Sequence, residues 1–148
     1  MSRTTHSTSR AALLRLGFQD PGTARQQLAL LGTESEVLLA ILGRTADPDQ
    51  ALTGLARLAE VAPDADALRS AVVEDEGTAM RLLTVLGASQ ALTDHLVRHP
   101  AHWRELTDPS LGSTRPAGYA VRAALLGSVG ADPAEPRPVA TVEAAADV

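Results

Sequence analysis

The sequence has no cysteine and no lysine, and only 2% of its 148 residues are aromatic. Without cysteine the chain can form no disulfide and perform no thiolate chemistry, which makes a cytosolic (cytoplasmic) protein the natural interpretation. Without lysine it can hold no Walker A phosphate-binding lysine. Because Phe18, Trp103 and Tyr119 are its aromatic residues, the core must be built from aliphatic side chains.

The chain also lacks a basic stripe and a long apolar run. Its formal net charge is −5, and arginines alternate with acidic residues along the sequence, which argues against a nucleic-acid partner. The longest apolar run, residues 37–42, is far shorter than the ~20 residues that cross a bilayer. We therefore expect neither nucleic acid nor membrane as a partner.

The first residues, 1–9, are polar and contain no acidic side chain. This composition is similar to that of a transit peptide. A secretory signal would need an apolar region, and Arg15 interrupts any such region here. A flexible N-terminus that leads into the first helix is the interpretation we adopt.

Prolines, glycines and capping residues divide the next part of the chain into helix-sized segments. The pairs Asp20-Pro21 and Asp47-Pro48 each offer an N-cap carboxylate followed by proline at the first helical position. Gly32 and Gly43 are predicted helix stops, and Ser89 is predicted to cap another helix. No segment of useful length alternates with a period of two, so strands are not expected. The sequence predicts an all-α fold, an irregular multi-helix bundle of short helices.

Apolar residues at helical spacing predict which side of each segment is buried. The predicted buried positions are Val37, Leu38, Ile41 and Leu42, then Leu52, Leu55 and Leu58, then Ala79, Leu82, Leu83 and Leu86, then Leu92, Leu96 and Val97, and finally Trp103 and Leu106.

The composition changes towards the C-terminal end. We expect a helical domain over residues 10–130 and a proline-rich linker over 131–138. Residues 139–148 begin a further helical pattern with Glu143 in its first turn. Because an unfinished amphipathic face has little to pack against, we expect the start of a truncated helix in a longer polypeptide. A disordered acidic tail is the alternative.

Three histidines invite a test for a metal site. His95, His99 and His102 follow one another at spacings of four and three, which could gather imidazoles around zinc on one helical face. Pro100, however, is expected to break the helix after His99 and to send His102 in another direction. We therefore predict exposed or capping histidines and no metal residue, with His99 favoured near a helix C-terminus by the helix dipole.

The acidic clusters of the sequence are candidates for metal or acid–base sites. Nucleotidyl transfer needs two carboxylates on adjacent same-face strand positions, preceded by a Gly-Ser turn that holds phosphate. The acidic clusters are Asp47 and Asp49, Asp64 and Asp66, and Glu74, Asp75 and Glu76, and none lies on a predicted strand. Gly112-Ser113 and Gly127-Ser128 are not followed by an Asp-x-Asp strand either. These carboxylates are predicted to be helix caps, so no catalytic, cofactor-binding or metal residue is expected.

The order of residues in the central segment resembles a known enzyme family. The pattern comprises Val85-Leu86-Gly87-Ala88-Ser89, Leu92, Asp94, Leu96, Arg98-His99-Pro100, Trp103 and Leu106, with earlier support from residues 13–18, Asp20-Pro21, Asp47-Pro48-Asp49, Ala51, Leu52 and Leu55. It is similar to the N-terminal helical region of the actinobacterial glutamine synthetase adenylyltransferase/adenylyl-removing enzyme. The resemblance covers roughly residues 10–130.

The resemblance implies a long bifunctional enzyme with two nucleotidyltransferase-like halves. One half moves AMP from ATP to a tyrosine of glutamine synthetase, and the other removes it by phosphorolysis. Magnesium, ATP, glutamine synthetase and a nitrogen-signalling regulatory protein are the implied cofactors and partners of the full-length enzyme. No cofactor is expected in this segment.

The chain departs from that family in one respect, because it stops where the first nucleotidyltransferase domain would be expected to begin. None of the family's catalytic residues has a matching position here. Two hypotheses follow: a non-catalytic N-terminal segment of the adenylyltransferase, inactive alone, or a free-standing helical interaction or adaptor module that binds a partner helix in an apolar groove.

Overall fold

The computed structural model describes residues 8–32, 35–109, 118–137 and 139. Its elements are α2 (Arg10–Arg15), α3 (Pro21–Leu31), α4 (Glu36–Leu42), α5 (Pro48–Val61), α6 (Ala65–Glu74), α7 (Glu76–Ala88), α8 (Gln90–Arg98), the 3-10 helix η1 (Pro100–Thr107) and α9 (Gly118–Ser128). These described residues contain no strand, which confirms the predicted all-α class. The chain divides into two units, Met1–Pro109 and Ser110–Val148. The expected domain over 10–130 takes in parts of both.

Helix ends in the first unit follow the punctuation of the sequence. Asp20 and Asp47 accept hydrogen bonds from the backbone N–H groups of Thr23 (3.1 Å) and Gln50 (2.9 Å), each with proline next in the chain. Gly32 ends α3 with a φ of 63°, a left-handed conformation that suits glycine. Local capping chemistry therefore sets these boundaries.

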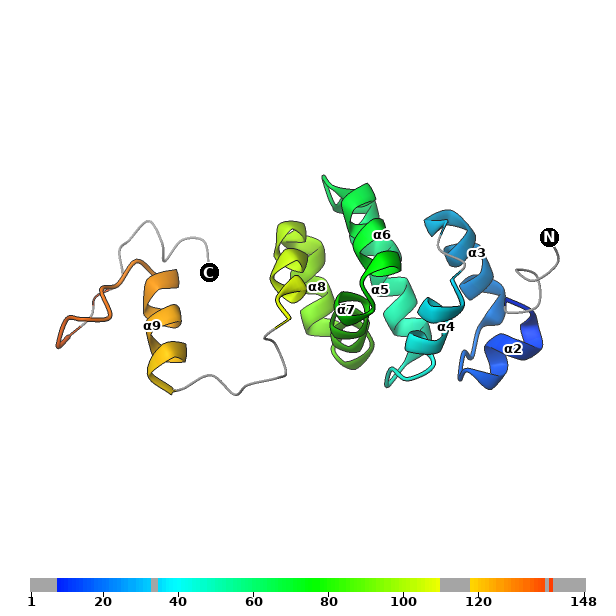
Figure 1. Ribbon diagram of the computed structural model, residues 1–148, viewed down its shortest axis with the longest axis horizontal. Helices are drawn as coiled ribbons and strands as arrows, with labels where there is room; N and C mark the ends of the chain where they lie inside the picture. The colour runs from blue at the N-terminus through cyan, green and yellow to red at the C-terminus, as the bar shows by residue number, and fades with distance from the viewer. Residues whose placement is uncertain (1–7, 33–34, 110–117, 138, 140–148) are drawn as a thin grey trace. The chain divides into compact units, whose positions relative to one another are not determined.

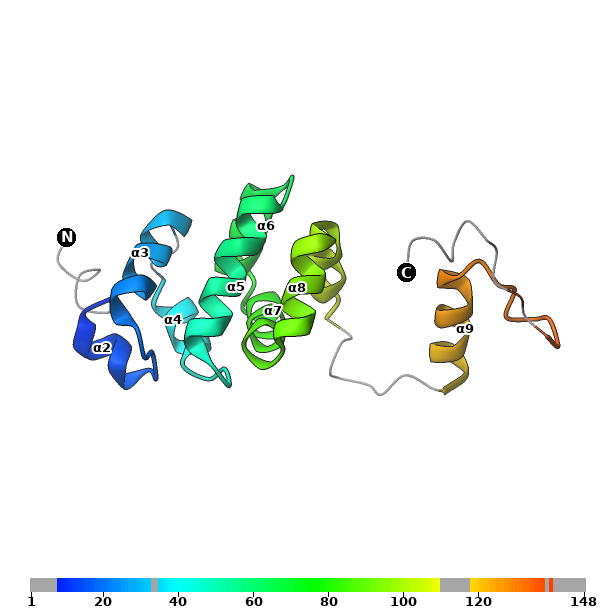
Figure 2. The ribbon, with the colours of Figure 1, turned by 180° about the vertical axis from the view of Figure 1, so that it is seen from behind.

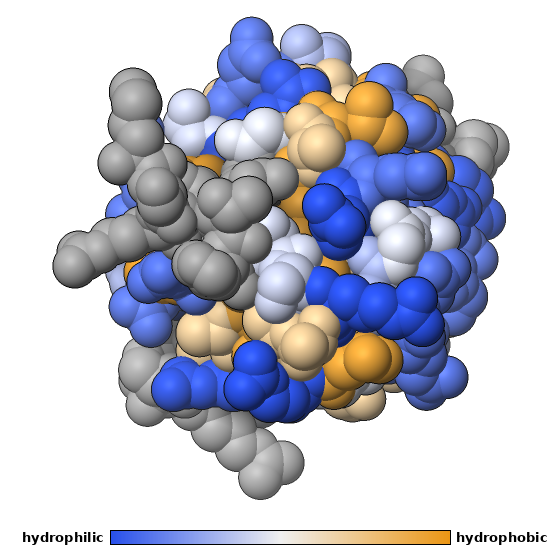
Figure 3. Space-filling model, turned by 90° about the vertical axis from the view of Figure 1, so that its right-hand side faces the viewer, coloured by the Kyte–Doolittle hydropathy of each residue, from blue (hydrophilic) through white to orange (hydrophobic). Residues whose placement is uncertain are grey.

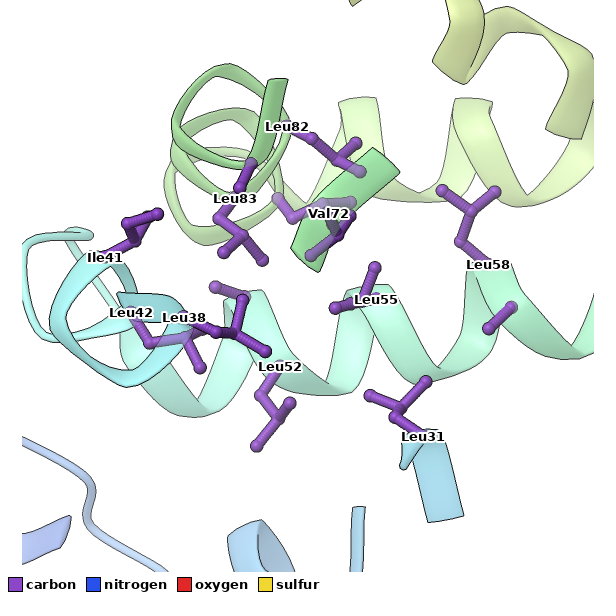
Figure 4. Close-up of a cluster of buried hydrophobic side chains, with 14 of the residues drawn as sticks. Leu31, Leu38, Ile41, Leu42, Leu52, Leu55, Leu58, Val72, Leu82 and Leu83 are labelled. Carbon is purple, nitrogen blue, oxygen red and sulfur yellow. The ribbon is translucent and has the colours of Figure 1, made fainter. Parts of the chain in front are cut away.

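The core lies around α5, whose most extensive packing contact is with α7 (Figures 1 and 2). Figure 4 shows aliphatic side chains from α3 to α7 converging on α5. The fully buried leucines include Leu52, Leu58, Leu82 and Leu83, each with 0% exposure. Burying a leucine stabilises a fold by roughly 1.5–3 kcal/mol, so these aliphatic side chains contribute much of the packing energy. Phe18 and Trp103 are buried in the same core cluster.

Two of the predicted buried faces need correction. Val37 is 49% exposed while Leu39 is buried, and Leu92 is 50% exposed while Thr93 is buried. In both helices the buried face is rotated from the expected one. The cause in α8 is a threonine that supplies both a methyl group to the core and a hydroxyl to backbone carbonyls.

Tight packing surrounds Gly87, which lies in the last turn of α7. The helix ends at Ala88, and Ser89 separates it from α8 and caps that next helix. A Cβ added at Gly87 would lie 3.0 Å from Thr45 Cβ and 3.1 Å from the Asp47 carbonyl oxygen. The glycine therefore permits a close helix approach.

The second unit contains α9, which has no buried residue. Residues 131–137 form turns and bends, and Ala131 is buried with its N–H bonded to the Leu126 carbonyl (2.8 Å). The helical start expected within 139–148 lies outside the described residues, apart from Val139. The expected flexible N-terminus lies outside them up to residue 7, and Ser9 caps α2.

The surface of the first unit carries both hydrophobic and hydrophilic side chains. Seen from the end at which α2 and α3 lie, hydrophobic patches are interrupted by hydrophilic side chains (Figure 3). In the part of the chain that the structure describes, every helix is too short or too polar to cross a bilayer.

Candidate functional site

The segment with the most distinctive chemistry is formed by α7, α8 and η1. A sharp connection joins α7 to α8, where Ser89 Oγ accepts a hydrogen bond from the Leu92 N–H (3.2 Å). The Leu86 carbonyl, near the end of α7, accepts hydrogen bonds from Gln50 Nε2 (2.9 Å) and Thr93 Oγ1 (3.3 Å). These side chains satisfy a carbonyl that the end of a helix would leave unpaired, and they lock α5, α7 and α8 together.

Two long-range contacts hold η1 in place. Trp103 is 2% exposed, and its Nε1 donates a hydrogen bond to Asp64 Oδ1 (3.3 Å). Arg81, in α7, donates from Nε to the Leu106 carbonyl (2.6 Å) and from a terminal nitrogen to the Thr107 carbonyl (3.3 Å). The middle and the C-terminal end of the 3-10 helix are thus tied to residues far away in the sequence.

Asp64 is the electrostatic centre of this attachment. Its carboxylate accepts the Trp103 hydrogen bond and forms an ion pair with Arg104, whose terminal nitrogen lies 2.6 Å from Oδ2. The Trp103 hydrogen bond, with Arg104 beside it, lowers the pKa of Asp64 below its ordinary value. Asp64 precedes α6 as predicted, but its side chain makes no cap hydrogen bond because it is committed to η1.

The three histidines gather at the junction of α8 and η1, which corrects the prediction that His102 points elsewhere. His95 Nε2 lies 3.0 Å from His102 Nδ1, and the His99 and His102 rings stack with centroids 5.3 Å apart. The helix does end before Pro100, as expected, with His99 as the C-cap residue. The 3-10 turn that follows, closed by the His102 N–H on the His99 carbonyl (3.0 Å), returns His102 to the side of His95.

A hollow of about 250 Å³ lies beside this cluster. It is lined by Val85, Leu92, His95, Leu96, His102, Glu105 and Leu106. Its walls are mostly apolar, and the polar groups lie among the imidazoles and the glutamate. Titratable groups and an apolar surface adjoin here.

Most carboxylates of the acidic clusters serve as structural acceptors. Asp47 caps α5, and Asp75 caps α7 by accepting hydrogen bonds from the N–H groups of Gly77 (2.9 Å) and Thr78 (3.2 Å). The Thr78 hydroxyl also donates to Asp75, which lowers the pKa of that carboxyl. Asp66 pairs with Arg69 at 2.7 Å on the surface.

Two acidic roles were missed by sequence reasoning because they join distant helices. Asp49 accepts hydrogen bonds from the N–H groups of Gln19 (2.6 Å) and Asp20 (3.2 Å), which fixes the start of α3 against α5. Asp94 pairs with Arg57 at 3.0 Å, and this arginine lowers the pKa of Asp94. Local spacing carries no signal for either contact.

These donor sets do not fit the magnesium–nucleotide site that the resemblance implies for the full-length enzyme. The described residues offer no strand with two carboxylates on one face, and the clustered aspartates already accept backbone or arginine hydrogen bonds. Nor does any group of three or more His, Cys, Asp or Glu side chains in this part of the chain have a disposition that could hold a metal ion. That no cofactor binds this segment stays a prediction.

Comparison with known proteins identifies relatives that carry the same enzyme name. Over 107 residues the chain is 47% identical to the bifunctional glutamine synthetase adenylyltransferase/adenylyl-removing enzyme of Streptomyces coelicolor, a match covering 68% of this chain and 11% of the relative. The enzyme of the same name from Mycobacterium leprae is 42% identical over 109 residues, 69% of this chain and 11% of the relative. The Mycobacterium tuberculosis enzyme is 43% identical over 100 residues.

The chain is thus homologous, over about two thirds of its length, to actinobacterial enzymes of this name, as the sequence motif predicted. It spans only about a tenth of the length of these relatives. No protein-family model matches the sequence, and no solved structure matches it.

Proposed function

We propose that this chain is the non-catalytic N-terminal segment of a bifunctional glutamine synthetase adenylyltransferase/adenylyl-removing enzyme, in which it acts as a helical scaffold. The observation that carries the proposal is the high identity to enzymes of that name over a stretch that is a small fraction of their length. The core around α5 supports a structural role, because its buried hydrophobic residues pack helices against one another.

The activity of the complete protein is part of the proposal. The full-length enzyme would transfer AMP from ATP to a tyrosine of glutamine synthetase and remove it by phosphorolysis, thereby regulating nitrogen assimilation. ATP and magnesium would be used by nucleotidyltransferase halves and not by this segment. The engagement of Asp47, Asp64 and Asp75 in caps and long-range hydrogen bonds supports that division of labour.

Glutamine synthetase and a nitrogen-signalling regulatory protein are the partners proposed for the full-length enzyme, in the cytoplasm. The absence of cysteine and the acidic net charge are compatible with that compartment and with a protein substrate.

A transfer assay tests the non-catalytic assignment. The purified 148-residue chain is incubated with labelled ATP, magnesium and glutamine synthetase, and labelled glutamine synthetase is measured. We expect no transfer above the level without the chain, and no release of AMP from adenylylated glutamine synthetase with phosphate. Transfer or release by the chain alone would contradict the proposal.

The scaffold role is tested in a complete enzyme. An aspartate is introduced into a full-length relative at the position equivalent to Leu86, which is buried in this chain. Aspartate at the position equivalent to the exposed Leu30 is the matched control. We expect the first variant to lose both activities and the second to keep them. Equal activity of the two full-length variants would show that the segment does not support catalysis.

A free-standing adaptor is the second candidate, favoured by the apolar hollow beside the half-exposed Leu92. The two candidates are separated by the DNA that follows codon 148. A reading frame that continues into a Gly-Ser…Asp-x-Asp pattern supports the first, whereas a stop codon supports an adaptor or a truncated gene.

A further inference from the structure

The histidine cluster has a geometry that the capping role of His99 does not explain. The centroid of the His95 ring lies 4.8 Å from that of His99 and 5.2 Å from that of His102. All three side chains are exposed, so an ion or small molecule from solvent can reach them. The closest approach is between two ring nitrogens, His95 Nε2 and His102 Nδ1, at 3.0 Å.

The positions of these two nitrogens are set by the surrounding fold. His95 stands on α8, whose neighbours Thr93 and Leu96 are buried. His102 precedes Trp103, which is buried and bonded to Asp64. Because each histidine lies next to an anchored residue, the pair is held together before any ligand arrives, and this lowers the entropic cost of binding.

We propose that His95 and His102 form a two-nitrogen chelating site for a divalent transition metal ion, of the kind represented by Ni²⁺ and Cu²⁺. A metal bound to imidazole nitrogens at about 2.0–2.1 Å, with the two bonds at a right angle, holds those nitrogens about 3.0 Å apart. Right-angled coordination is typical of Ni²⁺ and Cu²⁺, whereas tetrahedral Zn²⁺ requires a wider separation, about 3.4 Å. The observed spacing of 3.0 Å matches the separation of two nitrogens bound at a right angle, and on metal binding the rings turn so that both lone pairs point to the ion instead of along the hydrogen bond.

The proposed site uses two protein ligands, and water molecules occupy the other coordination positions of the metal ion. This agrees with the finding that no group of three or more ligating side chains in the described residues could hold an ion. The hydrogen bond now between the rings uses one N–H, so the donor imidazole must place its proton on its other ring nitrogen when the metal binds. The carboxylate of Glu105 lines the same hollow.

Metal binding has a structural consequence, because its two ligands lie on different elements. An ion held by both would clamp η1 against α8, at the rim of the apolar hollow. It would therefore stabilise the first unit by an amount that rises with the logarithm of its concentration once that concentration exceeds the dissociation constant.

The test uses the complete 148-residue chain without a histidine tag. Ni²⁺, Cu²⁺ and Zn²⁺ are titrated in turn by calorimetry, and binding is followed independently by the fluorescence of Trp103, the chain's one tryptophan and the neighbour of His102. We expect one ion per chain, Cu²⁺ bound more tightly than Ni²⁺ or Zn²⁺, quenching by Cu²⁺, and a rise in the thermal transition with added metal.

Variants identify the ligands. His95→Gln and His102→Gln should each weaken Ni²⁺ binding at least about tenfold, because each substitution removes one of the two protein ligands. His99→Gln is the matched control from the same cluster, and its Ni²⁺ affinity should be within about threefold of that of the parent chain. The same is expected of His6→Gln. All four variants should keep the parent's helical circular dichroism, because the substituted side chains in the cluster are exposed. The proposal is overturned if the chain binds no ion at a ratio of one, or if His99→Gln weakens binding as much as His95→Gln does.

Discussion

Trp103 donates its indole hydrogen bond to Asp64 across 39 positions of sequence, with 3.3 Å between Nε1 and Oδ1. The contact joins the residue before α6 to the middle of η1. It is reinforced by Arg104, whose guanidinium pairs with the same carboxylate and lies over the Trp103 ring at 5.1 Å from its centroid. One aspartate thus fixes the position of the short helix that carries His102.

This contact predicts how the attachment of η1 depends on pH. The pKa of Asp64 is lowered in the folded chain by the Trp103 hydrogen bond, so ionised Asp64 stabilises the fold at pH values above its unfolded pKa. That contribution is lost as the pH falls through the lowered folded pKa. We expect the Trp103 fluorescence of the parent chain to shift to longer wavelength on acidification, while Asp64→Asn, which can still accept the indole hydrogen bond, has a smaller pH dependence. Identical acid titrations of stability in the two proteins would contradict this.

Leu86 provides the sharpest test of the core. It is 0% exposed, and a charge placed there would be buried without a partner. We expect Leu86→Asp to destabilise the chain by more than about 4 kcal/mol and to abolish the cooperative thermal transition. Leu30→Asp, at a leucine that is 83% exposed, should change stability by less than about 0.5 kcal/mol. A normal transition in the Leu86 variant would mean that the face of α7 is wrongly assigned.

The local part of this fold could be predicted from the sequence. Asp-Pro pairs, Ser89 and Gly32 act on backbone groups within a few positions, so the pattern of residues alone locates the helix ends. Expectations about buried faces were right for α7, where the apolar stripe is broad. They were wrong at Leu92, because the neighbouring Thr93 can be buried once its hydroxyl reaches two backbone carbonyls.

The candidate site was harder to foresee because it depends on contacts between distant segments. Spacing indicated that Pro100 would end α8, and it does. The return of His102 to His95 depends on the 3-10 geometry of η1 and on anchors at Asp64 and Arg81, which lie far away in sequence. The hydrogen bonds that Asp49 accepts from the N–H groups of Gln19 and Asp20, just before α3, were missed for the same reason.

Replacing Gly87 by alanine should change stability in the direction opposite to that expected from helix propensity, because the new methyl group would be too close to its neighbours. Replacing a helical glycine by alanine normally stabilises a helix by up to about 1 kcal/mol. Here the new methyl group would meet Thr45 Cβ and the Asp47 carbonyl at 3.0 and 3.1 Å, neither of which is a flexible side-chain end. We expect Gly87→Ala to lower the free energy of unfolding by about 1–3 kcal/mol in denaturant titrations. Gly127→Ala, which meets nothing within 4 Å, is the control and should not lower it.

Arg81 should hold the C-terminal end of η1 against α7. Its side chain donates to the carbonyls of Leu106 and Thr107, two acceptors that follow one another at the end of the 3-10 helix. We expect Arg81→Ala to cost about 1–2 kcal/mol of stability and to speed amide hydrogen exchange in residues 102–107 more than in α5. Arg81→Lys should recover only part of the loss, because one ammonium group cannot reproduce two hydrogen bonds made from different nitrogens of a guanidinium. If lysine restored full protection, the arginine would act through its charge alone, and the two carbonyl contacts would not be what holds η1 to α7.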